Sequence, residues 1–178
     1  MASQRRCRKN LPLADSGVME LQPISLETLS GIRYSASLAP HKEFEQPEFI
    51  HVAFRGEYQD GSMSKPDALY LTATIAALDT AWYSQAFIID LTELKYDWGD
   101  EMDWVWGIGW QGWCCAQRPL AIIVSDLCRD ALKSLAPDEY EKHAVETFDD
   151  ALASIRRQKP EYDAIVAAFH MAACERNS

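Results

Sequence analysis

Two short apolar runs, residues 86–91 and 120–125, restrict the fold of this chain more than any other feature. Each is continuous and rich in isoleucine, leucine and alanine, which is the pattern of a strand buried on both faces of a parallel sheet. Parallel strands need a long crossover, usually a helix. A helix pattern that Ser64 can cap precedes the first run. Its apolar stripe consists of Leu71, Ile75, Leu78 and Trp82.

The remaining segments extend this strand and helix order into one domain. Residues 31–39 and 49–58 alternate between apolar and polar side chains, as half-buried strands do. Beyond residue 125 we predict a helix over 127–135 closed by Pro137, a strand over 144–148, a helix over 151–158 and a last helix over 160–174. The sequence therefore predicts a single α/β domain, residues 19–178, with a mixed β-sheet and an extra C-terminal helix.

Charge and cysteine content limit the classes of partner. The net charge of -10 disfavours binding to nucleic acid or to an anionic membrane and suits a partner with a basic surface. The five cysteines follow no paired spacing, so we expect reduced thiols and a cytoplasmic location. Residues 1–18 are basic, unlike the rest, and we expect them to form a flexible tail outside the domain. A short nucleic-acid-binding arm is the alternative for this tail.

The segment from Tyr96 to Cys115 contains five of the six tryptophans of the chain. We predict a helix over residues 103–117 that is apolar all round. One side of this helix would carry Trp104, Ile108 and Cys115, and the opposite side Trp106, Trp110, Trp113 and Gln117. One face of this helix can pack on the sheet, and the opposite face then needs another structure to bury it. The candidates are the C-terminal helix, a second copy of the chain in a homodimer, and a different protein.

Catalytic and metal-binding patterns are absent from the sequence. Asp97, Asp100, Glu101 and Asp103 lack the spacing of a calcium loop, and His170 with Cys174 supplies only two ligands. The scattered histidines, His41, His51 and His143, suggest no pairing of a base with a nucleophile, and there is no phosphate-binding loop. We therefore predict no catalytic residues, no metal and no cofactor.

Three short motifs resemble the STAS domain of anti-sigma-factor antagonists and sulfate transporters. Residues 87–92 (FIIDLT) resemble the family's first apolar strand, residues 119–124 (PLAIIV) the second, and residues 147–152 the start of the closing helix. The resemblance covers about residues 30–158 and includes the order of elements. It implies a STAS-like fold and a non-enzymatic domain that binds another protein through its second helix and the loop before it.

The chain departs from the STAS pattern in that loop, where the family carries a phosphorylatable serine. No serine or threonine occurs between Tyr96 and Cys115, so we expect no phosphorylation switch there. Asp100 either supplies a fixed negative charge near the helix N-terminus or merely begins the helix.

These observations predict a protein-binding domain that acts as a regulator or as a toxin-neutralising immunity protein. The predicted contact residues are Asp97, Trp98, Asp100, Glu101, Trp106, Trp110 and Trp113. The alternative is an enzyme or small-ligand-binding protein whose pocket is lined by these tryptophans and acids.

Overall fold

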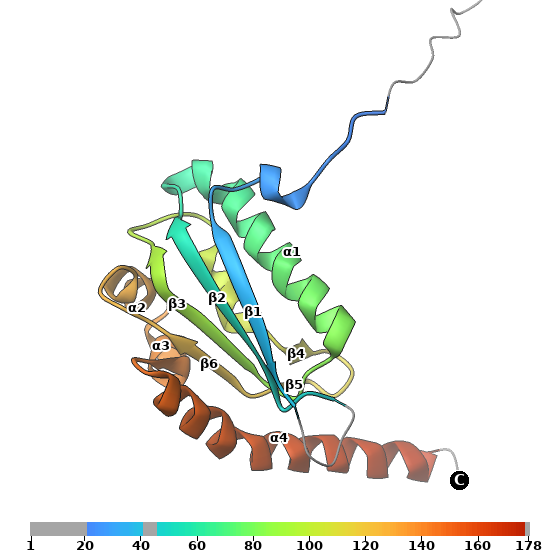
Figure 1. The fold of residues 1–178 in the computed structure, drawn as a ribbon. Coiled ribbons are helices and arrows are strands. Elements are labelled where there is room, and N and C mark those ends of the chain that lie inside the picture. The colour runs from blue at the N-terminus through green and yellow to red at the C-terminus, as the bar shows by residue number, and fades with distance from the viewer. Residues whose placement is uncertain (1–20, 41–45, 177–178) are drawn as a thin grey trace, which may run out of the picture.

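A five-stranded mixed sheet forms the centre of the molecule (Figure 1). The computed structural model describes residues 21–40 and 46–176, so the predicted tail, residues 1–18, lies outside the described residues. The strand order is β1-β2-β3-β6-β7. The strands are β1 (Arg33–Ala39), β2 (Phe49–Glu57), β3 (Phe87–Lys95), β6 (Leu120–Ile123) and β7 (Ala144–Val145). β1 is antiparallel to β2, and the other pairs are parallel, which confirms the predicted mixed α/β sheet.

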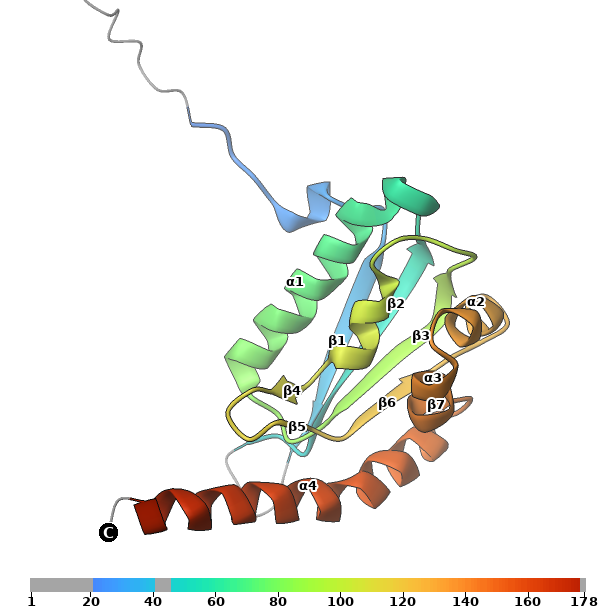
Figure 2. The same cartoon turned by 180° about the vertical axis from the view of Figure 1, so that it is seen from behind.

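Helices cover the two faces of the sheet unequally (Figure 2). They are α1 (Lys65–Trp82), α2 (Arg129–Leu135), α3 (Pro137–His143) and α4 (Phe148–Arg176), with the 3-10 helices η1 (Leu26–Thr28), η2 (Gly61–Ser64) and η3 (Met102–Gly107). α1, η3, α2 and α3 pack on one face in the larger core cluster, whereas α4 packs on the other in a smaller one. In the described part of the chain, no helix is both long and apolar enough to cross a membrane.

The apolar run in β3 explains this two-sided packing. Phe87, Ile89 and Leu91 belong to the larger cluster under α1, and Ile88 belongs to the smaller cluster under α4. Alternate residues of a strand point to opposite faces, so a strand covered on both sides must be apolar at consecutive positions. The same reasoning applies to β6, all four residues of which are buried.

The predicted helix over residues 103–117 is wrong. The segment forms η3 and then a hairpin of β4 (Trp110–Gln111) and β5 (Ala116–Gln117). Gly109 separates the two parts with a φ of 81°, a conformation that only glycine adopts without strain. A Cβ atom on Gly109 would also lie 3.2 Å from the Phe87 ring. Glycine here allows the backbone to turn close against the start of β3.

The predicted break at Pro160 is also wrong, because α4 is one continuous helix through that residue. Proline in a helix interior removes one hydrogen bond and costs about 3 kcal/mol. Contacts on both sides of Pro160 offset this cost. Gln158 accepts a hydrogen bond from the amide of Leu120 and donates one to its carbonyl, at 3.1 and 2.8 Å. Beyond the proline, Tyr162 donates to Gln111 of β4 at 2.8 Å. The predicted end of a helix just before Pro137 is confirmed, because α2 ends at Leu135, but Pro137 also begins α3, which was not predicted.

Candidate interaction surfaces

The predicted contact residues fall at two opposite ends of the sheet. The loop of residues 97–101, here called the Trp98 loop, follows β3 at the carboxyl ends of the parallel strands (Figure 2). The hairpin of residues 110–117 lies at the other end, beside α4 (Figure 1). Trp106 lies in η3 between them and is buried, with its ring 6.4 Å from that of Tyr140. The prediction grouped these residues on one surface because it assigned the connecting segment to a single helix.

Trp98 is exposed and yet held in a defined place. Its side chain is 60 % exposed, and its ring lies on the backbone of Gly61 at the start of η2. A Cβ atom on Gly61 would approach the Trp98 ring to 2.8 Å, and the φ of Gly61 is 53°. Both the space and the backbone conformation therefore require glycine at this position. The exposed indole rests on a surface shaped to receive it.

Hydrogen bonds from buried side chains fix the backbone of the Trp98 loop. The carbonyl of Asp100 accepts from the Tyr58 hydroxyl at 2.9 Å and from the Ser64 hydroxyl at 3.1 Å. The Tyr96 hydroxyl donates to the carbonyl of Gly99 at 3.2 Å. Burial raises the pKa of Tyr58 and that of Tyr96, so both phenols remain protonated donors throughout the neutral range. The loop is thus ordered before any partner arrives.

Acidic side chains dominate this end of the molecule. Lys95 contacts Glu57 at 2.6 Å and Asp97 at 3.3 Å, while Lys65 lies 3.8 Å from Glu101. The hydrogen bond to Glu57 is the main cause of the raised pKa of Lys95. Further exposed acids are Asp60, Asp100 and Asp103. The carboxylates outnumber the two lysines, so the surface around Trp98 has a negative potential.

The hairpin presents two more tryptophans at the other end of the sheet. Trp110 is 60 % exposed and Trp113 is 43 % exposed. The Trp113 ring lies 5.2 Å from that of Phe169 and 5.6 Å from that of His170, both on α4. The C-terminal helix therefore covers part of Trp113, which was one of the three covers considered for this tryptophan face. It leaves most of Trp110 exposed.

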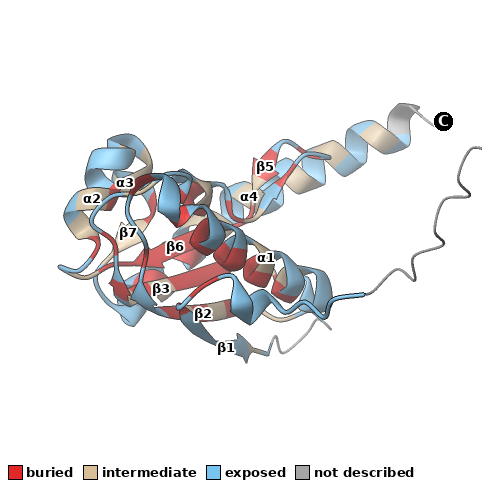
Figure 3. Ribbon diagram, turned by 90° about the horizontal axis from the view of Figure 1, so that it is seen from above, coloured by how far each residue is buried: buried red, intermediate tan, exposed pale blue. Residues whose placement is uncertain are grey.

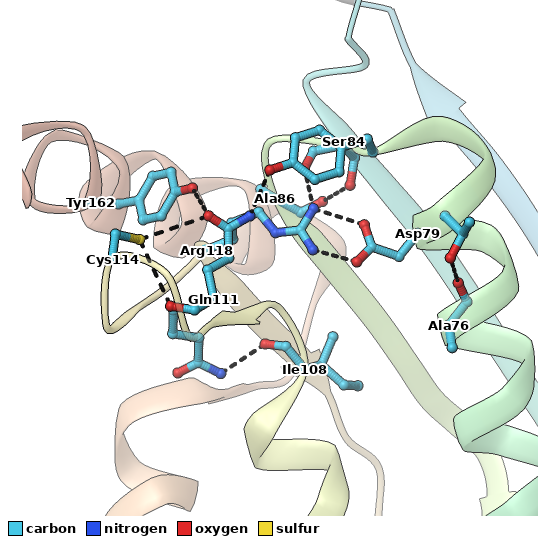
Figure 4. Close-up of polar contacts among 12 residues, drawn as sticks. Ala76, Asp79, Ser84, Ala86, Ile108, Gln111, Cys114, Arg118 and Tyr162 are labelled. Carbon is cyan, nitrogen blue, oxygen red and sulfur yellow. Dashed lines mark hydrogen bonds and ion pairs between the residues drawn. The ribbon is translucent and has the colours of Figure 1, made fainter. Parts of the chain in front are cut away.

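A buried arginine joins α1, the hairpin and β6 beneath this surface (Figure 4). Arg118 has only 4 % of its side chain exposed and pairs with both carboxylate oxygens of Asp79, at 2.8 and 2.5 Å. It also donates to the carbonyl of Ser84 at 2.8 Å. Its guanidinium lies 5.1 Å from the Tyr83 ring centroid and 4.7 Å from that of Phe87. Asp79 neutralises the charge of Arg118, whose Nε has no hydrogen-bond partner in the described part of the chain, and the pair fixes where the hairpin leaves the sheet.

The sequence did not single out these residues, because Asp79 and Arg118 are 39 positions apart. The only local signal is an arginine immediately before a buried apolar run. A cleft of about 530 Å³ lies above the arginine, and Tyr83, Trp113, Lys159 and Tyr162 contribute to its walls. None of the acids of the Trp98 loop lines this cleft. A second cleft, of about 470 Å³, does combine tryptophans with an acid, because Trp106, Trp110 and Asp103 contribute to its walls.

His51 has polar neighbours that the sequence did not indicate. Its Nδ1 lies 3.5 Å from the Ser37 hydroxyl, and its Nε2 lies 3.6 Å from Asp90. The sequence suggested no pairing of His51 with a nucleophile, and the structure places a serine hydroxyl near its ring. Both distances exceed those of good hydrogen bonds. We interpret the contact as a weak cross-strand cluster on β1, β2 and β3, not as an activated nucleophile. In the described part of the chain, no group of three or more His, Cys, Asp or Glu residues is arranged to hold a metal ion.

Comparison with known proteins gives one informative similarity. No protein-family model matches the sequence, and no curated protein matches it either. The crystal structure of an anti-sigma factor antagonist from Mycobacterium paratuberculosis superposes with a TM-score of 0.50 at 16 % sequence identity, covering 70 % of this chain and 95 % of that chain. The fold is STAS-like. At this level of identity the similarity establishes the fold alone, so the function has to be argued from the residues of this chain.

Proposed function

We propose that this STAS-like domain binds another protein through the Trp98 loop. The observation that carries the proposal is the exposed indole of Trp98, seated on Gly61 in a loop whose backbone is already fixed. Tryptophan is enriched among the residues that contribute most to protein interfaces, and an ordered side chain loses little entropy on binding. The STAS resemblance supports the same location, because that family meets its partners at the loop that follows this strand.

The partner surface is proposed to be basic. The acids around Trp98 outnumber Lys65 and Lys95, and the chain as a whole has a net charge of -10. Opposite charges at the rim of an interface speed association and exclude partners of the wrong sign. The same charge argues against a nucleic acid or an anionic membrane as the partner.

The complex is proposed to be stable and not switched by phosphorylation. The Trp98 loop contains no serine or threonine, and Asp100 places a permanent carboxylate in it. A fixed charge cannot be added or removed by a kinase and a phosphatase. This favours a toxin-neutralising role over a regulatory one, although both roles use the same binding event. The identity of the partner separates them, since only a toxin loses a harmful activity when the domain binds.

Trp98 and Trp110 form a matched pair for the test, because each is 60 % exposed. The loop after β3 and the hairpin that carry them lie at opposite ends of the sheet (Figure 1). Wild type, Trp98→Ala and Trp110→Ala serve as baits, and captured proteins are identified by mass spectrometry. We expect a partner that Trp110→Ala retains and Trp98→Ala loses. Circular dichroism confirms that both variants are folded. A partner that Trp98→Ala retains at wild-type level would refute the assigned surface.

A further inference from the structure

Strand β1 is an edge of the sheet with an open side. It pairs with β2, and in the described part of the chain no strand pairs with its other side. Six of its seven residues are exposed, and Figure 3 shows it at the border of the sheet in the colour of exposed residues. The sheet has one other edge, β7, which is only two residues long. β1 is thus the long open edge of this sheet.

The ladder shows which backbone groups of β1 face outward. The amide of Ile50 in β2 donates to Ala86 before β3, at 3.1 Å. The N–H and C=O groups of successive residues point to opposite sides of a strand, so the odd-numbered residues of β2 face β1. Their partners in β1 include Ser35 and Ser37. The intervening residues, Tyr34, Ala36 and Leu38, therefore direct their N–H and C=O groups to the open edge.

This edge lacks the features that normally prevent edge-to-edge pairing. Natural sheets protect open edges with lysine, proline, β-bulges or very short strands. Between Tyr34 and Leu38 there is no charged residue and no proline, and the register with β2 runs without a bulge. Tyr34 and Leu38 also leave 41 % and 42 % of their side chains exposed. An open edge of this kind is suited to receive another strand.

We propose that β1 pairs with β1 of a second copy of this chain, antiparallel, about a two-fold axis at Ala36. In this register Tyr34 lies opposite Leu38 of the second copy, and Ala36 lies opposite itself. All three are residues whose backbone groups face outward, so the Tyr34–Leu38 pairs and the Ala36–Ala36 pair can exchange hydrogen bonds. The two sheets then form one continuous sheet through two copies.

The side chains are complementary in the same register, which is why a second copy is the proposed occupant. Tyr34 and Leu38 form apolar cross-strand pairs, and Ser35 lies opposite Ser37 of the second copy. The charged residue of β1, Arg33, lies opposite Ala39 of the second copy, so no like charges meet. An isologous interface needs this self-complementarity. The proposal is independent of the Trp98 loop, which follows a different strand, β3.

The test is sedimentation velocity of the full chain from about 1 to about 100 μM, because a dimer must respond to concentration by mass action. We expect wild type to shift from the mass of one chain towards that of two. Ala36→Pro should remain monomeric at all concentrations. It removes an outward N–H at the axis and leaves the β1–β2 ladder intact. Ala36→Thr keeps that N–H and should dimerise like wild type.

A charge exchange tests the position of the axis. Ala36→Lys places two lysines opposite each other and should give a monomer, as should Ala36→Glu with two glutamates. An equimolar mixture of the two variants should dimerise again. A monomeric wild type over the whole concentration range would overturn the proposal, and so would a dimer that survives Ala36→Pro. Binding of β1 to an extended segment of another protein in place of a second copy would also leave wild type monomeric and refute the assignment.

Discussion

Removing the carboxylate of Asp79 should destabilise the fold strongly. Arg118 is 4 % exposed, and Asp79 supplies both acceptors of its bidentate pair (Figure 4). In Asp79→Ala the Arg118 guanidinium keeps its hydrogen bond to the carbonyl of Ser84 and its contacts with two aromatic rings. It loses the carboxylate that balances its charge. Breaking a buried ion pair in this way costs about 3–5 kcal/mol. We expect the lower end, about 3 kcal/mol, because Asp79 itself is 29 % exposed and water can enter the space left by its side chain.

The loss corresponds to a fall in Tm of about 6–12 °C for a domain of this size. Urea unfolding and calorimetry measure it. The decisive control is the double variant Asp79→Leu with Arg118→Met, which removes both charges and should recover most of the stability, since buried ion pairs contribute little over well-packed apolar residues. The single variants Asp79→Leu and Arg118→Met complete a double-mutant cycle with this double variant. A loss below about 1 kcal/mol in Asp79→Ala, or losses that simply add in this cycle, would refute the reasoning.

Two other perturbations test the account of the hairpin and of a buried histidine. Gly109→Ala should lower the free energy of unfolding by about 1–3 kcal/mol, because the φ of Gly109 is 81° and the new Cβ would lie 3.2 Å from Phe87. Urea unfolding measures this loss. Gly112→Ala is the control and should change the free energy of unfolding little, because a Cβ there meets nothing within 4 Å. Burial lowers the pKa of His143, so the unfolded chain binds the proton more readily, and stability should fall as the pH drops below about 6.5 towards the lowered pKa. His143→Gln should reduce that slope in unfolding curves recorded between about pH 7 and pH 5, and an unchanged slope would exclude His143 as its cause.

Much of the fold could be predicted because its periodic segments agree with their final environments. The two apolar runs became β3 and β6, and the helix pattern after Ser64 became α1. The tryptophan segment could not be predicted. A short stretch that is apolar all round has no periodicity to separate a helix from a hairpin. The outcome depended on the close approach of Gly109 to Phe87, 22 positions earlier in the chain.

The Trp98 loop, too, could be predicted only in part from the sequence. The position of the Trp98 loop after β3 follows from the order of elements, and the acids in it are visible in the sequence. The seat on Gly61 is not, because it depends on η2 and the loop meeting in space. Nor did the sequence show that Trp98 and Trp110 belong to different ends of the molecule. The cover of Trp113 by α4 required Pro160 to lie inside a continuous helix.

The most direct test of the central claim is the affinity of the captured partner for three purified proteins, measured by isothermal titration calorimetry. Loss of an anchoring tryptophan costs about 2 kcal/mol or more, so Trp98→Ala should bind about 30-fold more weakly than wild type, with Trp110→Ala unchanged. Wild-type binding should also weaken between about 0.05 and 0.5 M salt, because the acids around Trp98 are screened. Unchanged affinity in Trp98→Ala, together with a loss in Trp110→Ala, would contradict the account and place the interface on the hairpin.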